Sequence, residues 1–154
     1  MLLLLAGGKV YPMSKYFVAA AVAGMLTIAI LGSLLYGVVF PSLFRANMGS
    51  AVGVMKSPPD FAWIGLSHVP FGILLTLVVS WRGVLTARGG VVAGGTLGFL
   101  MAASYDLAQY GTTNLWTLKL TLIEPFITMV MVAGAGAVVA AVLSRQHRPQ
   151  PLTP

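Results

Sequence analysis

The chain has 154 residues, of which 58% are hydrophobic and only 8% are charged, and its mean hydropathy is +0.92. A soluble domain normally carries about 25% charged residues because its surface faces water, so this composition excludes a soluble globular protein. The net charge of +6 comes from basic residues that stand singly between apolar runs. That pattern indicates membrane topology and argues against nucleic acid as a partner. Because there is no cysteine, disulfides and cysteine-based metal sites are also excluded.

The first fifteen residues contain a short apolar run, Leu2–Ala6, followed by Gly7, Gly8 and Lys9. No basic region precedes this run, and the run is too short for the core of a secretory signal peptide. Two interpretations stay open. Residues 1–15 form an N-terminal interfacial segment, or translation starts at Met13.

Four apolar stretches are long enough to cross a hydrocarbon core of about 30 Å, which requires about 20 helical residues. They predict membrane-spanning helices over about 16–40, 61–81, 91–110 and 116–143. Pro41 ends the first helix, Asp60 is the candidate N-cap of the second, and Gly89 and Gly90 lead into the third. We therefore predict an all-α polytopic membrane protein, in which a compact four-helix bundle over residues 16–143 is followed by a polar, Pro-containing tail over 144–154.

The placement of Lys and Arg predicts the orientation of this bundle, because cytoplasmic loops carry more of them. With both termini in the cytoplasm, six basic residues lie inside and three outside. The inside set is Lys9, Lys15, Arg82, Arg88, Arg145 and Arg148, and the outside set is Arg45, Lys56 and Lys119. We predict an N-in/C-in topology.

Small residues mark the positions at which membrane helices approach one another closely. The third span carries Gly94, Gly98 and Ala102 at four-residue spacing, and the fourth span carries Ala133 and Ala137. These residues predict helix packing, either within the chain or against a partner.

Polar and ionisable side chains within a membrane span are rare and costly, so each is a candidate for function. The N-in topology brings four of them, one from each span, to the outer half of the bundle. They are Tyr36, His68, Asp106 and Glu124. This convergence predicts an intramembrane polar cluster.

The cluster has two interpretations. In the first, it only fixes helix register: His68 and Glu124 hydrogen-bond to each other, and Asp106 pairs with Lys119. In the second, it binds a small ligand, a proton, a metal or haem. The ligand spacing is not diagnostic of a metal, and haem would require a second axial ligand, so no metal site and no cofactor is assigned.

No catalytic residue is assigned either, because the sequence has no phosphate-binding loop, nucleophile elbow or His-Glu-x-x-His motif. An enzyme acting on lipid would have His68 and Glu124 as its only acid–base pair.

Three segments carry a resemblance: Leu35–Pro41, Tyr105-Asp106-Leu107 and Asn114–Glu124. In these segments the chain resembles small four-span bacterial membrane proteins of unknown function, which have a Tyr-Asp-Leu segment at the end of the third span and an acidic residue in the last. The resemblance implies a four-helix fold in the bacterial cytoplasmic (inner) membrane. It implies no activity.

Two functions follow as hypotheses. The first is a non-enzymatic structural or accessory subunit, whose partners are the lipid bilayer and either other membrane subunits or further copies of the chain. The alternative is a stand-alone bundle that binds a small ligand, proton, metal or haem in the outer polar pocket around His68, Asp106 and Glu124.

Overall fold

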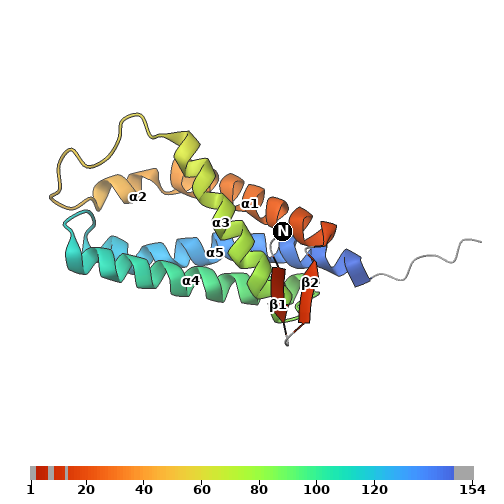
Figure 1. Cartoon of the computed structure of the whole chain (residues 1–154). Helices are drawn as coiled ribbons and strands as arrows, with labels where there is room; N and C mark the ends of the chain where they lie inside the picture. Colours follow the sequence, from red (N-terminus) through yellow and green to blue (C-terminus); the bar gives the residue numbers. More distant parts are fainter. Residues whose placement is uncertain (1–2, 7–8, 13, 148–154) are drawn as a thin grey trace, which may run out of the picture.

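A computed structural model describes residues 3–6, 9–12 and 14–147 of the chain (Figure 1). A short hairpin of β1 (Leu3–Ala6) and β2 (Lys9–Pro12) comes first. The helices that follow are α1 (Lys15–Leu34), a π-helical turn (Leu35–Val39), α2 (Pro41–Ala46), α3 (Phe61–Trp81), α4 (Ala87–Thr112), α5 (Leu118–Ser144) and a 3-10 turn (Arg145–His147).

Four of these helical segments are long and apolar enough to cross a membrane: Lys15–Val39, Phe61–Trp81, Ala87–Thr112 and Leu118–Ser144. The predicted all-α bundle of four membrane helices is confirmed, and the chain is an integral membrane protein. The N-in/C-in topology stays a prediction, because it concerns the membrane around the bundle.

The ends of the predicted helices differ from the observed ones where a cap was overlooked. The α4 helix begins at Ala87 because the side chain of Thr86 accepts a hydrogen bond from Gly89 N, so Gly89 and Gly90 lie inside the helix and do not lead into it. Asp60 occupies the N-cap position of α3 as predicted, yet its side chain makes no capping hydrogen bond. Its carboxylate instead lies 3.8 Å from Lys56 Nζ.

The ends of the chain were predicted only in outline. The predicted interfacial segment contains the antiparallel hairpin, with Leu3 opposite Pro12 and Ala6 opposite Lys9. Its place at a membrane surface stays a prediction. Most of the predicted polar tail, residues 148–154, lies outside the described residues.

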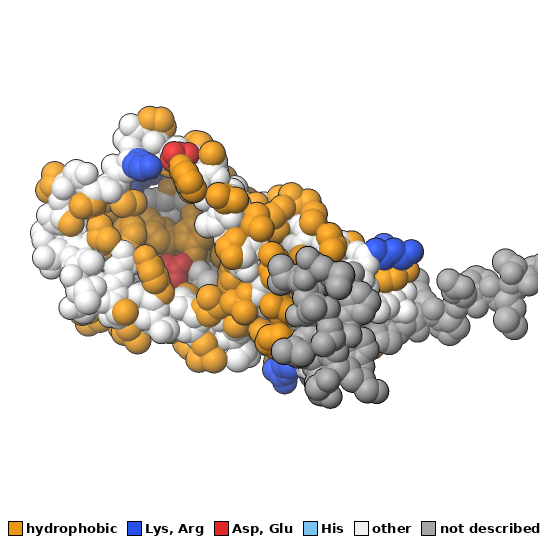
Figure 2. Space-filling model, in the orientation of Figure 1, with side chains coloured by type: hydrophobic (Ala, Val, Ile, Leu, Met, Phe, Trp, Pro, Cys, Tyr) orange, Lys and Arg blue, Asp and Glu red, His pale blue; other side chains and the backbone are white. Residues whose placement is uncertain are grey.

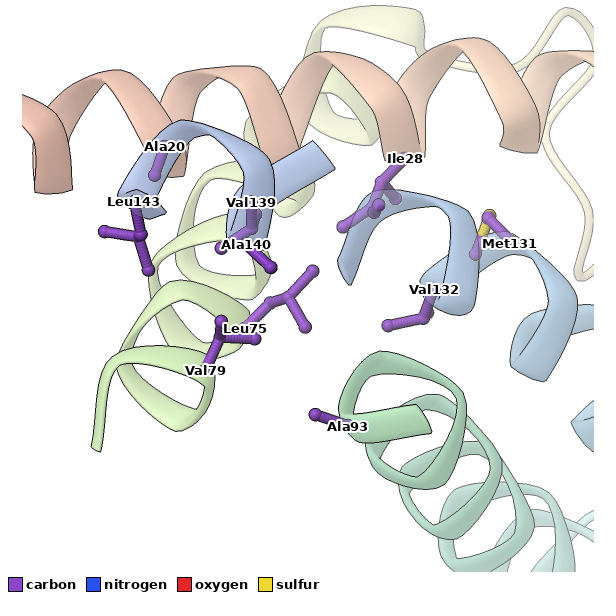
Figure 3. Packing of buried hydrophobic residues seen from close by; sticks show 11 residues of the cluster. Ala20, Ile28, Leu75, Val79, Ala93, Met131, Val132, Val139, Ala140 and Leu143 are labelled. Atoms are coloured by element: carbon purple, nitrogen blue, oxygen red, sulfur yellow. The ribbon is translucent and has the colours of Figure 1, made fainter. Parts of the chain in front are cut away.

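The hydrophobic core lies around the C-terminal half of α5, which contacts each of the other three long helices. Figure 3 shows side chains from all four helices meeting there. They are Ala20 and Ile28 from α1, Leu75 and Val79 from α3, Ala93 from α4, and Met131, Val132, Val139, Ala140 and Leu143 from α5.

Within this core, α4 and α5 approach each other so closely that their backbones touch. A Cβ atom at Gly90 would overlap the carbonyl oxygen of Gly136, and one at Gly94 would overlap that of Val132. Only glycine fits at such positions. Gly98 also faces α5, where a Cβ atom would lie 2.7 Å from Val132 Cβ.

The other predicted packing residues lie to the sides of this contact. The α5 residues that meet the α4 glycines include Val132, Gly136 and Ala140. Ala133 lies beside them, where it would meet a Cβ atom at Gly95 at 3.4 Å. Ala137 is half-buried, and Ala102 lies farther along α4, in the wall of a cavity.

The α3 helix packs mainly on α1 and crosses the bundle at an angle (Figure 1). The two helices approach closely at Gly72, where a Cβ atom would lie 2.9 Å from the carbonyl oxygen of Ala21. Because α3 follows α1 in this way, it makes few contacts with α4. The bundle is therefore closed at one end and open near α2.

Candidate functional site

A cavity of about 790 Å³ occupies the half of the bundle next to α2. Its walls come from the π-helical turn after α1, from α2, from the middle of α3, from the second half of α4 and from the first half of α5. Figure 2 shows a hollow with an acidic side chain on its floor and hydrophobic side chains around its rim. The view runs across the helices, so the hollow opens to the side of the bundle.

Glu124 and two hydroxyl groups form the hydrogen-bonded part of the floor. The Tyr36 hydroxyl donates to Glu124 Oε1, and Thr128 Oγ1 donates to the same oxygen at 2.7 Å. The two hydroxyl oxygens lie 2.8 Å apart. Two donors on one carboxylate oxygen hold the Glu124 side chain in a single orientation.

Tyr36 takes its place in this group from a π-helical turn at the end of α1. Phe40 N donates to Leu35 O at 2.8 Å, an i→i−5 hydrogen bond that widens the helix locally. Such turns are rare and are found often at functional sites. The sequence placed Tyr36 near the outer end of the first span but gave no signal of the turn itself.

Asp106 contributes a second carboxyl group from α4. The residue is only 6% exposed, and it lines the same cavity as Glu124. Asp106 Oδ2 and Glu124 Oε2 are both buried without a hydrogen-bond partner. A buried carboxylate is costly unless it is paired, so these two oxygens are the least satisfied atoms of the floor.

A cluster of aromatic side chains closes the cavity at the α2 end. The Phe44 ring stacks edge-on with Tyr36, at 5.2 Å between centroids, and with Trp116, at 6.1 Å. Trp116 Nε1 in turn donates to Gln109 Oε1 at 3.3 Å. Phe44, Gln109 and Trp116 were not predicted at the site, because they lie at span ends or outside the spans, where aromatic residues ordinarily mark the membrane interface.

Backbone contacts hold this aromatic group in place by joining the segment after α2 to the turn between α4 and α5. Gly49 N donates to Leu115 O at 2.8 Å, and Thr117 N donates to Asn47 O at 3.0 Å. A side chain at Gly49 would overlap the carbonyl group of Asn114. The short α2 helix is thereby fixed over the cavity.

His68 is separate from the other predicted cluster residues. It does not line the cavity, although its neighbours Ser67 and Pro70 do. His68 lies one helical turn before Gly72, on the face of α3 that meets α1. It is half-buried and its Nδ1 atom has no partner. The structure therefore brings Tyr36, Asp106 and Glu124 to one cavity and places His68 outside the lining of that cavity.

This arrangement bears on the alternatives left open by the sequence. Within the described residues, Glu124 bonds to hydroxyl groups and not to His68, and the one ion pair joins Lys56 to Asp60 and leaves Lys119 apart from Asp106. The two pairs expected for helix register are therefore not formed, and the Tyr36–Glu124 hydrogen bond links the end of the first span to α5 in their place. The described part of the chain also has no group of three His, Cys, Asp or Glu residues that could hold a metal ion.

Neither protein-family models, nor curated proteins, nor solved structures gave a significant match to the chain. The function must therefore be argued from the cavity. Its floor offers oxygen acceptors and its walls are apolar, which suits a small molecule that has a hydrocarbon body and a hydrogen-bond-donating end.

Proposed function

We propose that the protein is a non-enzymatic integral membrane protein that binds a small amphiphilic molecule in the cavity next to α2. The observation that carries this proposal is the buried, unpartnered carboxylate oxygen of Asp106 on the floor of an open cavity. Polar groups at membrane depth are retained chiefly where they serve a function. The volume of about 790 Å³ lies in the range of small-molecule sites, roughly 300–1,000 Å³.

The side opening suggests how such a molecule reaches the site. If the long helices cross the bilayer, the hollow in Figure 2 faces lipid. A molecule dissolved in the membrane enters with its apolar part against residues such as Phe71, Leu74 and Met101. Its polar end then meets the carboxyl groups on the floor.

The location of the protein is part of the same proposal. We place the chain in the bacterial cytoplasmic membrane with both termini inside, as the segments Tyr105–Leu107 and Asn114–Glu124 and the distribution of Lys and Arg imply. The cavity then lies in the outer half of the membrane.

A single-tryptophan variant tests whether the cavity binds a ligand. Trp63 and Trp81 are 66% and 57% exposed on the outside of the bundle, so Trp63→Phe/Trp81→Phe leaves Trp116 in the cavity wall as the only fluorophore of its kind. The purified variant in lipid nanodiscs is titrated with N-phenyl-1-naphthylamine, an uncharged amphiphile. We expect saturable quenching of Trp116 above the linear background from probe dissolved in lipid.

Two further substitutions in this background provide the matched comparison. Ala102→Phe fills the cavity, whereas Ala108→Phe adds the same ring on the exposed face of α4. The saturable component should disappear in the first variant and persist in the second. Identical linear quenching in all three proteins would contradict the proposal.

An accessory role remains a second candidate, because the segment between α2 and α3 has exposed apolar side chains outside the membrane helices. Val52 is 93% exposed, and Val54 and Met55 are more than half exposed. A neighbouring subunit would remove this apolar surface from water. Extraction in mild detergent, followed by size-exclusion chromatography and mass spectrometry, should then recover other membrane subunits in stoichiometric amounts. These should be lost with Val52→Ser/Met55→Ser, whereas a partner-free chain would overturn the accessory role.

A further inference from the structure

The two carboxyl groups on the cavity floor point to the chemical class of the ligand. Asp106 comes from α4 and Glu124 from α5, and both side chains line the cavity. Each has one oxygen that is buried without a partner. Two adjacent acidic groups in a medium of low dielectric repel each other when charged, and a positive charge bound between them would relieve that repulsion.

The protein does not supply that charge at the cavity. None of the described residues that line the cavity is Lys, Arg or His. Lys56, the basic residue found in an ion pair within the described part of the chain, is exposed and pairs with Asp60. Among the described residues no third His, Cys, Asp or Glu stands beside the two carboxyl groups, so the site has few ligands for a metal ion.

The walls favour an organic cation over a small inorganic one. Five aromatic residues line the cavity: Tyr36, Phe44, Phe71, Tyr105 and Trp116. The faces of aromatic rings attract ammonium-type cations, most strongly where water is excluded. Aliphatic and methionine side chains complete the apolar lining, and these suit a hydrocarbon body.

We propose that the cavity binds a lipophilic organic cation, with its apolar body between α3 and α4 and its positive charge neutralised by the Asp106 and Glu124 carboxylates. The inference rests on the proposed binding function and names its ligand class. The ammonium group of a membrane lipid and that of a free hydrophobic amine share this chemistry.

A pair of ions matched in size and shape tests the charge requirement. Tetraphenylphosphonium is cationic and tetraphenylborate is anionic, and each is titrated against the single-tryptophan protein in nanodiscs of uncharged lipid. Each quenching curve is corrected with the Ala102→Phe protein, so that ordinary partition into the bilayer cancels. We expect saturable binding of the cation to be at least about tenfold tighter than that of the anion.

Substitutions on the floor test whether its carboxyl groups cause the preference for the cation over the anion. Asp106→Asn and Glu124→Gln keep the shape of each side chain and should each weaken tetraphenylphosphonium binding by about tenfold, which is more than they weaken binding of the uncharged naphthylamine. Asp60→Asn removes an acidic group outside the cavity and should leave both affinities unchanged. If one of the floor variants does not fold, the other variant still tests the role of the floor. The comparison of tetraphenylphosphonium with tetraphenylborate on the unaltered protein also decides the question.

The outcomes separate this inference from the proposed function. Equal binding of the two ions, together with saturable binding of the uncharged naphthylamine, would overturn the cationic ligand and leave a general apolar site. Absence of saturable binding for all three probes would overturn both proposals. Native mass spectrometry of the protein from its own membranes then distinguishes the sources, because a retained lipid with an ammonium headgroup and a retained free amine differ in mass, and both agree with the inference.

Discussion

The two ends of the α4–α5 helix pair show opposite solutions to packing in a membrane. At one end Gly90 and Gly94 let the α4 backbone touch α5, with no room for a side chain. At the other end the same two helices hold Asp106 and Glu124 beside a cavity of about 790 Å³. The difference lies in the residues that face each other. Small residues let the helices touch at one end, and polar and aromatic residues line the cavity at the other.

The closed end of the bundle supports the open one. Membrane helices gain no hydrophobic stabilisation from packing against each other in lipid. Close van der Waals contact therefore provides much of the stability of the bundle. The contacts around Gly136 and the core residues of α5 supply that contact. Unpartnered carboxylate oxygens are then tolerated at the end where contact is sparse.

The largest effect is expected from breaking the closed end. Gly94→Leu would force a side chain into the carbonyl group of Val132, so we expect it to lower the free energy of unfolding by about 3 kcal/mol. Gly111→Leu is the matched control, because this α4 glycine has open space around it. Unfolding in mixed dodecyl maltoside and sodium dodecyl sulfate micelles, followed by circular dichroism, measures both. Equal costs in the two variants would contradict the close contact.

A smaller effect is expected from loosening the hydrogen bonds of the open end. Tyr36→Phe removes one of the two donors to Glu124 Oε1, and we expect a loss of about 1 kcal/mol in the same unfolding measurement. Tyr110→Phe removes an α4 hydroxyl that makes no hydrogen bond within the described residues and should cost much less. If the two losses were equal, the Tyr36 hydroxyl would not bond to Glu124 in the membrane-embedded protein.

The smallest effect is expected from His68→Ala. Because His68 faces α1 and does not line the cavity, the variant should bind the uncharged naphthylamine as tightly as the parent. Its free energy of unfolding should change by no more than about 0.5 kcal/mol, because the lost packing is offset by removal of an unpartnered nitrogen. Loss of naphthylamine binding in a folded variant would place His68 back in the site.

The sequence predicted the fold well because membrane helices are specified by long apolar runs. The bounds 61–81 of α3 agree with the helix Phe61–Trp81, since Pro59 and Asp60 stand before it and Arg82 follows. The start of α4 was placed late because the threonine cap at Thr86 carries a weaker signal than the Gly89–Gly90 pair.

The site was predictable only in part. Intramembrane acids are rare, so Asp106 and Glu124 stood out in the sequence. The rotation of α3 about its axis could not be predicted from the sequence, because the stripe that contains His68 and Gly72 can face either α1 or the cavity. The close approach at Gly72 turns it toward α1. Phe44 and Trp116 were missed because their place depends on the contacts between Gly49 and Leu115, which link distant segments.

Cysteine labelling tests the contrast between the two ends most directly, because the chain has no cysteine of its own. Ala102→Cys and Ala93→Cys place one thiol each on α4, the first in the cavity wall and the second in the core, where Ala93 is 3% exposed. Each purified variant in nanodiscs is treated with N-ethylmaleimide and analysed by mass spectrometry. We predict labelling at position 102 and protection at position 93 until the protein is denatured. Equal protection at both positions, or faster labelling at 93, would contradict an open cavity beside a closed helix contact.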